Sequence, residues 1–159
     1  MSNADLIRTF YGAFARRDGA AMGRCYDPAA QFEDPVFTLS GWQVPAMWRM
    51  LCERASDLRI ELGQVRADDV RGSARWEAWY TFSATGRPVH NVIEASFTFG
   101  PGRIVTHRDR FNLYRWAGQA LGWPGILFGW TPVLHRAIRR RSAAALRAYA
   151  QRNGLGPTP

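Results

Sequence analysis

Three side chains in this sequence could carry acid–base chemistry: Asp34, His107 and Asp109. Asp34 precedes Pro35, which restrains the aspartate backbone to extended conformations and would hold its carboxyl at the end of a strand. A carboxyl in apolar surroundings has its pKa raised by desolvation and can act as a general base. The alternative is that Asp34 only accepts hydrogen bonds from the backbone of its own turn.

His107 and Asp109 lie two residues apart in a predicted strand, so their side chains should share one face, with Phe111 beyond them. Arg108 and Arg110 should lie on the opposite face. A neighbouring carboxylate fixes the tautomer of an imidazole, and such a pair suits a general acid or base. The alternative is a buried, hydrogen-bonded pair that only stabilises the sheet.

Other chemistries lack a motif. The sequence has no HExxH, no paired CxxC, no glycine-rich phosphate loop and no GxSxG, so we expect neither a metal nor a cofactor. Cys25 and Cys52 lie in apolar helical surroundings and are predicted to be buried free thiols. The first residues lack the pattern of a signal peptide, and with the free thiols this favours a cytoplasmic location.

The length and composition favour one domain with a sizeable core, since 159 residues include 47% hydrophobic ones. All 21 basic residues are arginine. Residues 1–109 hold 13 arginines and 13 acidic residues, whereas residues 110–159 hold 8 arginines and no acidic residue. The net charge of +8 therefore belongs to one segment, which argues against a nucleic-acid partner.

Hydrophobic periodicity then predicts the elements that position these side chains. Helical spacing indicates a helix over residues 4–17 that starts at a Ser2–Asp5 capping box, a short helix through Met22, Cys25 and Tyr26, and a third helix after Gly41. A short strand is expected at 31–35, and period-two strands at 58–62, 73–84, 88–99 and 103–112. This order of elements indicates an α+β domain.

The C-terminal part differs from the rest. Residues 116–134 carry no charge and are interrupted by glycine and proline, and a basic helix begins near Pro132. Two interpretations stay open for this stretch. It could be a flap over a pocket mouth or a dimer partner, or it could touch a membrane surface with Arg139, Arg140 and Arg141 at anionic headgroups.

Three motifs resemble the nuclear transport factor 2-like superfamily, which includes SnoaL-like cyclases and ketosteroid isomerases. They are Arg17-Asp18-Gly19, Gln31-Phe32-Glu33-Asp34-Pro35-Val36, and the stretch from Gly102 to Phe111. The resemblance implies a cone-shaped, curved antiparallel sheet wrapped around N-terminal helices, with a C-terminal extension. It places this domain at residues 1–115. For residues 116–159 we expect an apolar flap and a basic C-terminal helix packed on the same domain.

The isomerase comparison assigns roles by position. Asp34 matches the catalytic base. The tyrosine and the protonated aspartate that stabilise the enolate oxygen fall at Phe10 and Ala95, with Tyr11 and Glu94 one residue away. A shift of one residue in a strand moves a side chain to the other face. We therefore do not expect a true steroid isomerase.

The resemblance also implies a pocket on the His107 face of the sheet. Its predicted ligand-binding residues are Phe10, Phe14, Trp48, Trp76, Tyr80, Asn91, Ile93, Phe97 and Phe111, and its catalytic residues are Asp34, His107 and Asp109. This wall suits a small apolar, polycyclic or lipid-like molecule, processed by isomerase, cyclase or hydrolase chemistry. The alternatives are a binding module without catalysis, and a dimerisation domain that pairs through the outer sheet face of Glu77, Trp79, Arg108 and Arg110. A homodimer is expected.

Overall fold

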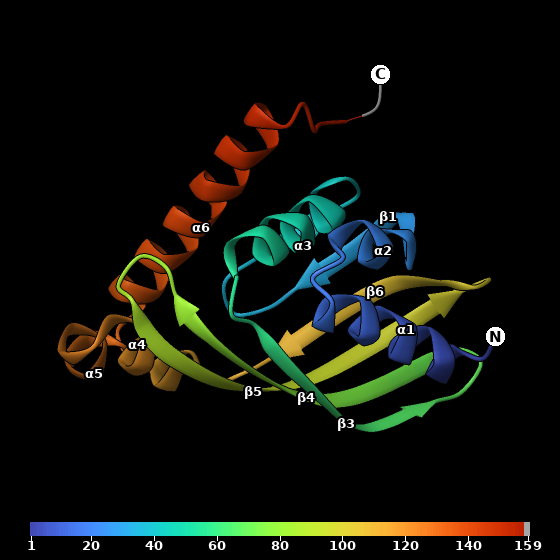
Figure 1. The fold of residues 1–159 in the computed structure, drawn as a ribbon, viewed down its shortest axis with the longest axis horizontal. Helices are drawn as coiled ribbons and strands as arrows, with labels where there is room; N and C mark the ends of the chain where they lie inside the picture. Colours follow the sequence, from blue (N-terminus) through green and yellow to red (C-terminus); the bar gives the residue numbers. More distant parts are fainter. Residues whose placement is uncertain (158–159) are drawn as a thin grey trace.

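A computed structural model describes residues 1–157 and shows an α+β fold with one curved, unclosed sheet (Figure 1). The elements are α1 (Asn3–Ala15), α2 (Gly19–Arg24), β1 (Tyr26–Glu33), β2 (Thr38–Ser40), α3 (Gln43–Arg54), β3 (Arg59–Ala67), β4 (Arg71–Phe82), β5 (Arg87–Gly100), β6 (Arg103–Arg110), α4 (Leu113–Leu121), α5 (Trp123–Phe128) and α6 (Pro132–Arg152). The strand order is β2-β1-β6-β5-β4-β3. Helices α1, α2 and α3 cover one face of the sheet, and α4, α5 and the start of α6 lie together at one end (Figure 1).

The sequence pattern explains most of these elements. The Ser2 hydroxyl accepts from the Asp5 amide and the Asp5 carboxylate accepts from the Ser2 amide, so the predicted capping box starts α1. Strands β3 to β6 are joined by short turns and pair as antiparallel neighbours, because short connections permit no crossover. The predicted α+β class and curved sheet are confirmed.

The N-terminal edge of the sheet differs from the prediction. Tyr26 begins a strand instead of ending a helix, and β1 runs parallel to β6. Pro28 is tolerated in this strand because the pairing with β6 shifts register between Tyr26 and Gln31, where the missing proline N–H leaves no gap in the ladder. The uncharged stretch, for which no helix was predicted before Pro132, contains most of α4 and all of α5.

The core lies between the inner sheet face and helices α1 and α3, and it is dominated by aromatic rings. Phe10 contacts Tyr11, Tyr26 and Trp48 edge to face, with ring centroids 5.0 to 5.5 Å apart. Such edge-to-face packing fills space at the density of a protein interior and adds to the stability gained by burial.

The outer sheet face is polar. Trp79 lies between the Arg59 guanidinium, 4.0 Å from the ring centroid, and the His90 ring, whose centroid is 4.6 Å away. His90 Nε2 is 2.6 Å from a Glu77 carboxylate oxygen. These contacts cover much of Trp79 within the chain itself, and the predicted homodimer through this face stays a prediction.

Candidate functional site

Asp34 lies in a tight turn directly after β1. Its Oδ1 accepts hydrogen bonds from the backbone amides of Val36 at 2.7 Å and Phe37 at 2.6 Å. The same turn is held from α6, where Arg139 Nε donates to the Pro35 carbonyl at 2.8 Å. Asp34 therefore accepts hydrogen bonds from the backbone of its own turn, as the alternative interpretation held, but only through Oδ1. Within residues 1–157, Oδ2 accepts no hydrogen bond.

The surroundings of Asp34 favour its protonated form. Burial raises the pKa of the Asp34 carboxyl from 3.8 to about 6, and the nearby Asp109 charge adds to the rise, although the two backbone amides oppose it. The Asp34 charge in turn contributes to the raised pKa of Tyr80, which burial mainly causes. Asp34, Asp109 and Tyr80 therefore lie close enough to influence one another electrostatically.

His107 on β6 is fully enclosed. Its side chain has no exposed surface and lies against the rings of Phe10, Phe32, Trp48 and Phe97, with centroids 4.4 to 5.9 Å away. It is therefore buried in the core, and no ligand can touch it without displacing an aromatic ring.

A chain of hydrogen bonds fixes the state of this imidazole. Trp48 Nε1 donates to the Tyr26 hydroxyl at 2.9 Å, and that hydroxyl is 2.6 Å from His107 Nδ1. His107 Nε2 is 2.9 Å from Asp109 Oδ1. Every group is satisfied when Tyr26 donates to Nδ1 and Nε2–H donates to the Asp109 carboxylate. The His107 tautomer is thus set by its two neighbours, and His107 positions Asp109.

Asp109 faces inward and is 4% exposed. It pairs across the ladder with Ala95, whose small side chain leaves room beside the carboxyl. Glu94 points to the outer face, where a carboxylate oxygen lies 3.5 Å from Arg75 Nη1. The register left open by the isomerase comparison is therefore settled: Ala95 lies on the inner face, and the acidic group there comes from the next strand.

Two buried donors on the inner face have no partner within residues 1–157: the Tyr11 hydroxyl and Trp76 Nε1. The rings of these two residues lie 5.4 Å apart. Burial raises the pKa of Tyr11 well above its usual value, and the Asp109 charge contributes. An unpartnered buried hydroxyl costs about 1–3 kcal/mol, so two together mark a polar position inside an aromatic core.

Tyr11 is the residue that the sequence interpretation missed. The comparison by position selected Phe10 and placed Tyr11 on a different face of the helix, yet both side chains are buried. The spacing of Ile7, Tyr11 and Phe14 at i, i+4 and i+7 was the signal that could have identified it.

Most of the predicted ligand-binding residues form the core. Phe10, Phe14, Trp48, Trp76, Ile93 and Phe97 are buried and pack mainly on one another, while Tyr80, Asn91 and Phe111 are partly exposed. The rings therefore fill the space that we predicted as a hollow along the sheet. The structure brings Asp34 and Asp109 into one electrostatic cluster and encloses His107 behind them.

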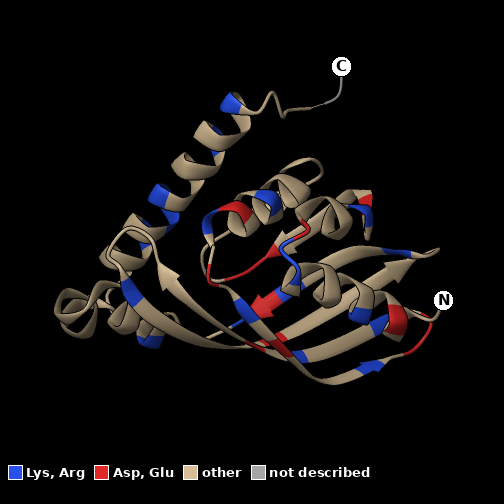
Figure 2. Cartoon of the chain, viewed as in Figure 1, with Lys and Arg blue, Asp and Glu red and all other residues tan. Residues whose placement is uncertain are grey.

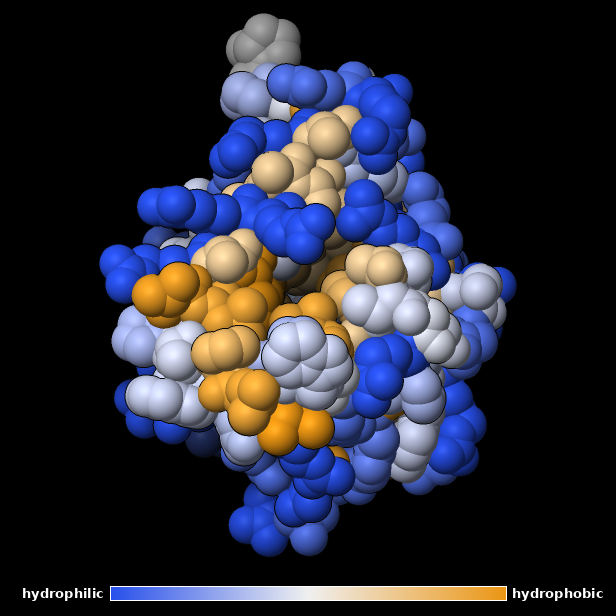
Figure 3. All heavy atoms as spheres, turned by 90° about the vertical axis from the view of Figure 1, so that its left-hand side faces the viewer, coloured by the Kyte–Doolittle hydropathy of each residue, from blue (hydrophilic) through white to orange (hydrophobic). Residues whose placement is uncertain are grey.

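An opening exists at the end of the molecule where α4, α5 and α6 meet. Figure 3 looks at this end and shows hydrophobic side chains gathered around a hollow. Tyr80 contributes to this end, because its hydroxyl accepts from Trp116 Nε1 of α4 at 2.8 Å. Val36 and Phe111 also pack here, against Leu113, Ala117 and Ile138.

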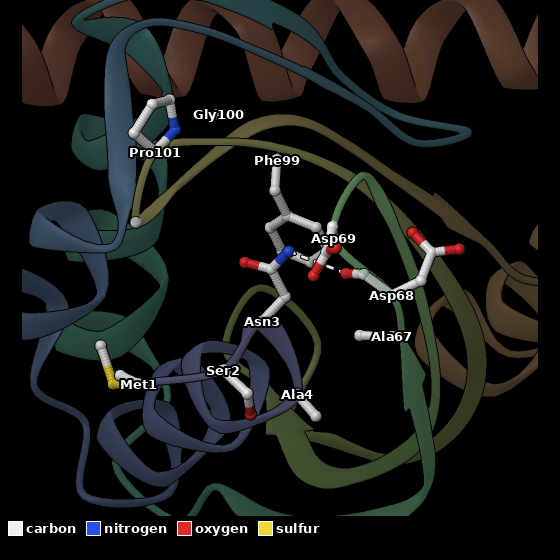
Figure 4. Close-up of a pocket in the computed structure, with 11 residues that line it drawn as sticks. Met1, Ser2, Asn3, Ala4, Ala67, Asp68, Asp69, Phe99, Gly100 and Pro101 are labelled. Atoms are coloured by element: carbon white, nitrogen blue, oxygen red, sulfur yellow. Dashed lines mark hydrogen bonds between the residues drawn. The ribbon is translucent and has the colours of Figure 1, made fainter.

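A separate depression of about 580 Å³ lies at the opposite end, between the start of α1 and two strand turns (Figure 4). Asn3 crosses it and donates to the Asp68 carbonyl at 2.8 Å. None of the predicted site residues lines this depression. Among the described residues, no group of three or more His, Cys, Asp and Glu side chains could hold a metal ion.

Comparisons with known proteins agree with this architecture. Residues 7–107 match the model of the SnoaL-like domain. A search of curated proteins found no matching sequence. Among solved structures, an LEH-like epoxide hydrolase from M. tuberculosis is 17% identical, with a TM-score of 0.63 over 77% of this chain and 90% of that one.

Two further structures are similar. A candidate polyketide cyclase from Pseudomonas putida is 19% identical, with a TM-score of 0.63 over 76% of this chain and 98% of that one. A protein with a ketosteroid isomerase-like fold from Catenulispora acidiphila, in complex with trimethylamine, is 13% identical, with a TM-score of 0.67 over 80% of this chain and 97% of that one. At these identities the likeness concerns the fold.

Proposed function

This chain belongs to the SnoaL-like domain family, and from that premise we propose that it acts on a small apolar molecule by acid–base chemistry in which Asp34 is the general base. The reaction would be an isomerisation, cyclisation or hydrolysis that needs no cofactor. The substrate would enter at the α4–α6 end, beside Tyr80 and Phe111.

The observation that carries the proposal is the Asp34 carboxyl. One of its oxygens is fixed by the backbone, the other accepts no hydrogen bond from residues 1–157, and burial raises its pKa to about 6. Such a carboxyl is ionised at neutral pH yet is a stronger base than an exposed aspartate, which suits proton abstraction or activation of a water.

The inner donors support a role in stabilising charge. The isomerase comparison placed its two oxyanion donors at Phe10 and Ala95, which have no polar group. Of the inner-face neighbours of those positions, Tyr11 on the same helix is a donor, whereas Asp109 on the adjacent strand is a carboxylate that accepts from His107 Nε2–H. An oxygen of a substrate that accepted the Tyr11 O–H would satisfy a donor that is unpartnered in the described chain.

His107 would act through Asp109. Its Nε2–H holds Oδ1 of Asp109, so His107 is a positioning residue. A substrate that reaches Tyr11 must displace part of the aromatic core, because Tyr11 is 1% exposed. The proposal therefore includes an opening of the core beneath the α4–α6 end.

The named activities of similar structures favour the same class of chemistry, since one is an epoxide hydrolase and another a candidate polyketide cyclase. A binding module without catalysis is the second candidate. The enclosure of His107 by four rings favours it, because a sealed imidazole transfers no proton to a ligand.

The test is turnover of a panel of apolar epoxides and enolisable cyclic ketones, followed as kcat/KM against pH. We expect activity to rise with pH through about 6 as Asp34 loses its proton, and Asp34→Asn to lose roughly 10²–10⁴-fold. Asp69→Asn, an exposed carboxyl at the opposite end of the sheet, is the matched control. An unchanged Asp34→Asn rate would overturn the assignment of the base. Binding of panel compounds without turnover would replace catalysis by the binding module.

A further inference from the structure

The α4–α6 end exposes its large apolar side chains. The apolar rim, as we name it, consists of Tyr114, Trp123, Ile126, Leu127, Phe128, Trp130 and Val133, which are 44% to 71% exposed. Outside the rim, the exposed large hydrophobic residues of the described chain are Met1 and Val70 alone. Large apolar side chains gathered at one place on a surface mark an interaction site more often than an accident of folding.

Small residues form the contact between α5 and α4. A Cβ on Gly125 would collide with the Ala117 carbonyl of α4, and a Cβ on Gly129 would collide with the Gly125 carbonyl. Helix α5 therefore packs through Gly125 against α4 at Ala117, which is fully buried. The large side chains of α5 are 52% to 68% exposed, and of these Ile126 also touches α4 at Gly118.

The charges around the rim all have one sign. Residues 110–157 hold 8 arginines and no acidic residue. Arg115 of α4 and Arg136 and Arg140 of α6 are exposed, and the last two share a helix face with Val133. Arg87 extends from the β4–β5 turn to the same end, where its Nε donates to the Gln119 carbonyl at 2.9 Å. Figure 2 shows these helices with basic and no acidic positions.

We propose that the apolar rim docks on the surface of a lipid bilayer that contains anionic lipids. The rim would enter the interfacial region, where the amphipathic rings of Trp123 and Trp130 are favoured, while the surrounding arginines contact phosphate groups. Apolar insertion and basic attraction are the two signals that together give stable anchoring. Within residues 1–157 no helix is long and apolar enough to cross a membrane, so the contact is peripheral.

Charge complementarity selects the bilayer over a second copy of the chain. Two copies that paired through the rim would bring the same arginines together, and residues 110–157 offer no carboxylate to balance them. Like charges brought together at an interface are destabilising. An anionic headgroup layer supplies the missing negative charge for the arginines around the rim.

Docking at the rim would bring the hollow at this end to the bilayer surface. The hollow at this end opens on the same face as the hydrophobic side chains (Figure 3). An apolar molecule dissolved in the bilayer would then reach the Asp34 turn without crossing water. This last step rests on the proposed function, whereas the docking itself does not.

The test is co-sedimentation with vesicles of phosphatidylcholine alone or mixed with phosphatidylglycerol. We expect binding to the mixed vesicles that weakens as salt is raised. The triple variant Arg115→Gln, Arg136→Gln, Arg140→Gln should bind on the order of a hundredfold more weakly, at roughly fivefold for each arginine near the surface. Trp123→Ser with Leu127→Ser and Trp130→Ser should lower binding to both kinds of vesicle at least about tenfold.

Matched controls come from the opposite end of the molecule. Arg8→Gln with Arg66→Gln and Arg71→Gln removes the same charge, and Val70→Ser removes an exposed apolar residue; both should bind as the wild type does. Circular dichroism and thermal unfolding show that each variant is folded. Absence of vesicle binding by the folded wild type overturns the proposal. A dimer in the absence of lipid that the rim variant dissociates would instead identify the rim as an interface between copies.

Discussion

The sheet interior under α1–α3 and the α4–α6 end are both rich in large apolar side chains, and the fold places them in opposite ways. In the interior the rings of Phe10, Trp48 and Phe97 surround His107 and leave it no exposed surface. In α5 the close contact with α4 is made by Gly125, and the large residues of the helix are 52% to 68% exposed. Apolar composition alone therefore does not decide burial; the size of the residues at the contact between elements does.

The largest expected effect comes from the centre of the interior. His107→Ala should lower the free energy of unfolding by about 3–5 kcal/mol, because it leaves Asp109 as a buried charge without its partner and opens a cavity among aromatic rings. Urea denaturation measures the loss. His90→Ala, which breaks a partly exposed pair with Glu77, should cost no more than about 1 kcal/mol. Equal losses for the two variants would contradict the contrast between inner and outer faces.

The next largest effect is expected for Asp34, which lies between the sheet interior and the α4–α6 end. Asp34→Asn should stabilise the protein by about 3 kcal/mol above about pH 7 and by little below about pH 4. Folding raises the pKa of Asp34 from 3.8 to about 6. Below about pH 4 the carboxyl is protonated in both states and costs no stability. As pH rises through about 6 it becomes a buried charge, so the wild type loses stability. Asparagine keeps the acceptor for Val36 and Phe37 and has no charge to bury.

Urea denaturation across this pH range measures the effect of Asp34→Asn, with Asp69→Asn as the control for losing an exposed carboxyl. A stability difference between Asp34→Asn and the wild type that does not change with pH would show that Asp34 is not desolvated. It would also remove the electrostatic argument for a general base.

Two tyrosines of the interior should respond in opposite directions. Tyr11→Phe removes an unpartnered buried hydroxyl and should raise the free energy of unfolding by about 1–2 kcal/mol. Tyr26→Phe removes a hydroxyl bonded to Trp48 and His107 and should lower it by about 1–2 kcal/mol. Thermal and urea unfolding of both variants measure these two changes in the free energy of unfolding. Destabilisation by both would mean that the Tyr11 hydroxyl has a partner in solution.

The smallest effect belongs to the apolar rim. Leu127→Ser should change the free energy of unfolding by no more than about 0.5 kcal/mol, because the side chain is 56% exposed. Leu6→Ala, a leucine buried in α1, should cost about 2–5 kcal/mol and is the comparison. A Leu127→Ser loss similar to that of Leu6→Ala would show that the rim is covered in the isolated protein.

Much of the fold could be predicted from local patterns. The capping box at Ser2, the period-two strands and their turns, and the helix start at Thr131, whose hydroxyl accepts from the Leu134 amide, all depend on neighbours within a few residues. The start of β1 at Tyr26, its parallel pairing with β6 and the helices α4 and α5 were not predicted. The parallel pairing joins distant residues such as Tyr26 and Ile104, and α5 depends on the close packing of Gly125 against Ala117 of the preceding helix.

The candidate site was predicted less completely. Sequence motifs selected Asp34, His107 and Asp109, and the strand period placed His107 and Asp109 on one face. The partners that define their chemistry lie 81 residues away for Tyr26 and His107, and no local pattern reports such a contact. The buried Tyr11 hydroxyl was missed because only the packed core shows that it has no partner within residues 1–157.

The sequence by itself determined the elements that short-range physics controls: capped helices, alternating strands, and a C-terminal segment whose charge is all positive. The tertiary structure decided which aromatic rings fill the interior, which carboxyls are desolvated and which apolar residues face the solvent. The physical reason is that hydrogen bonds and alternation act between near neighbours, whereas packing and desolvation depend on side chains that only the whole fold brings together.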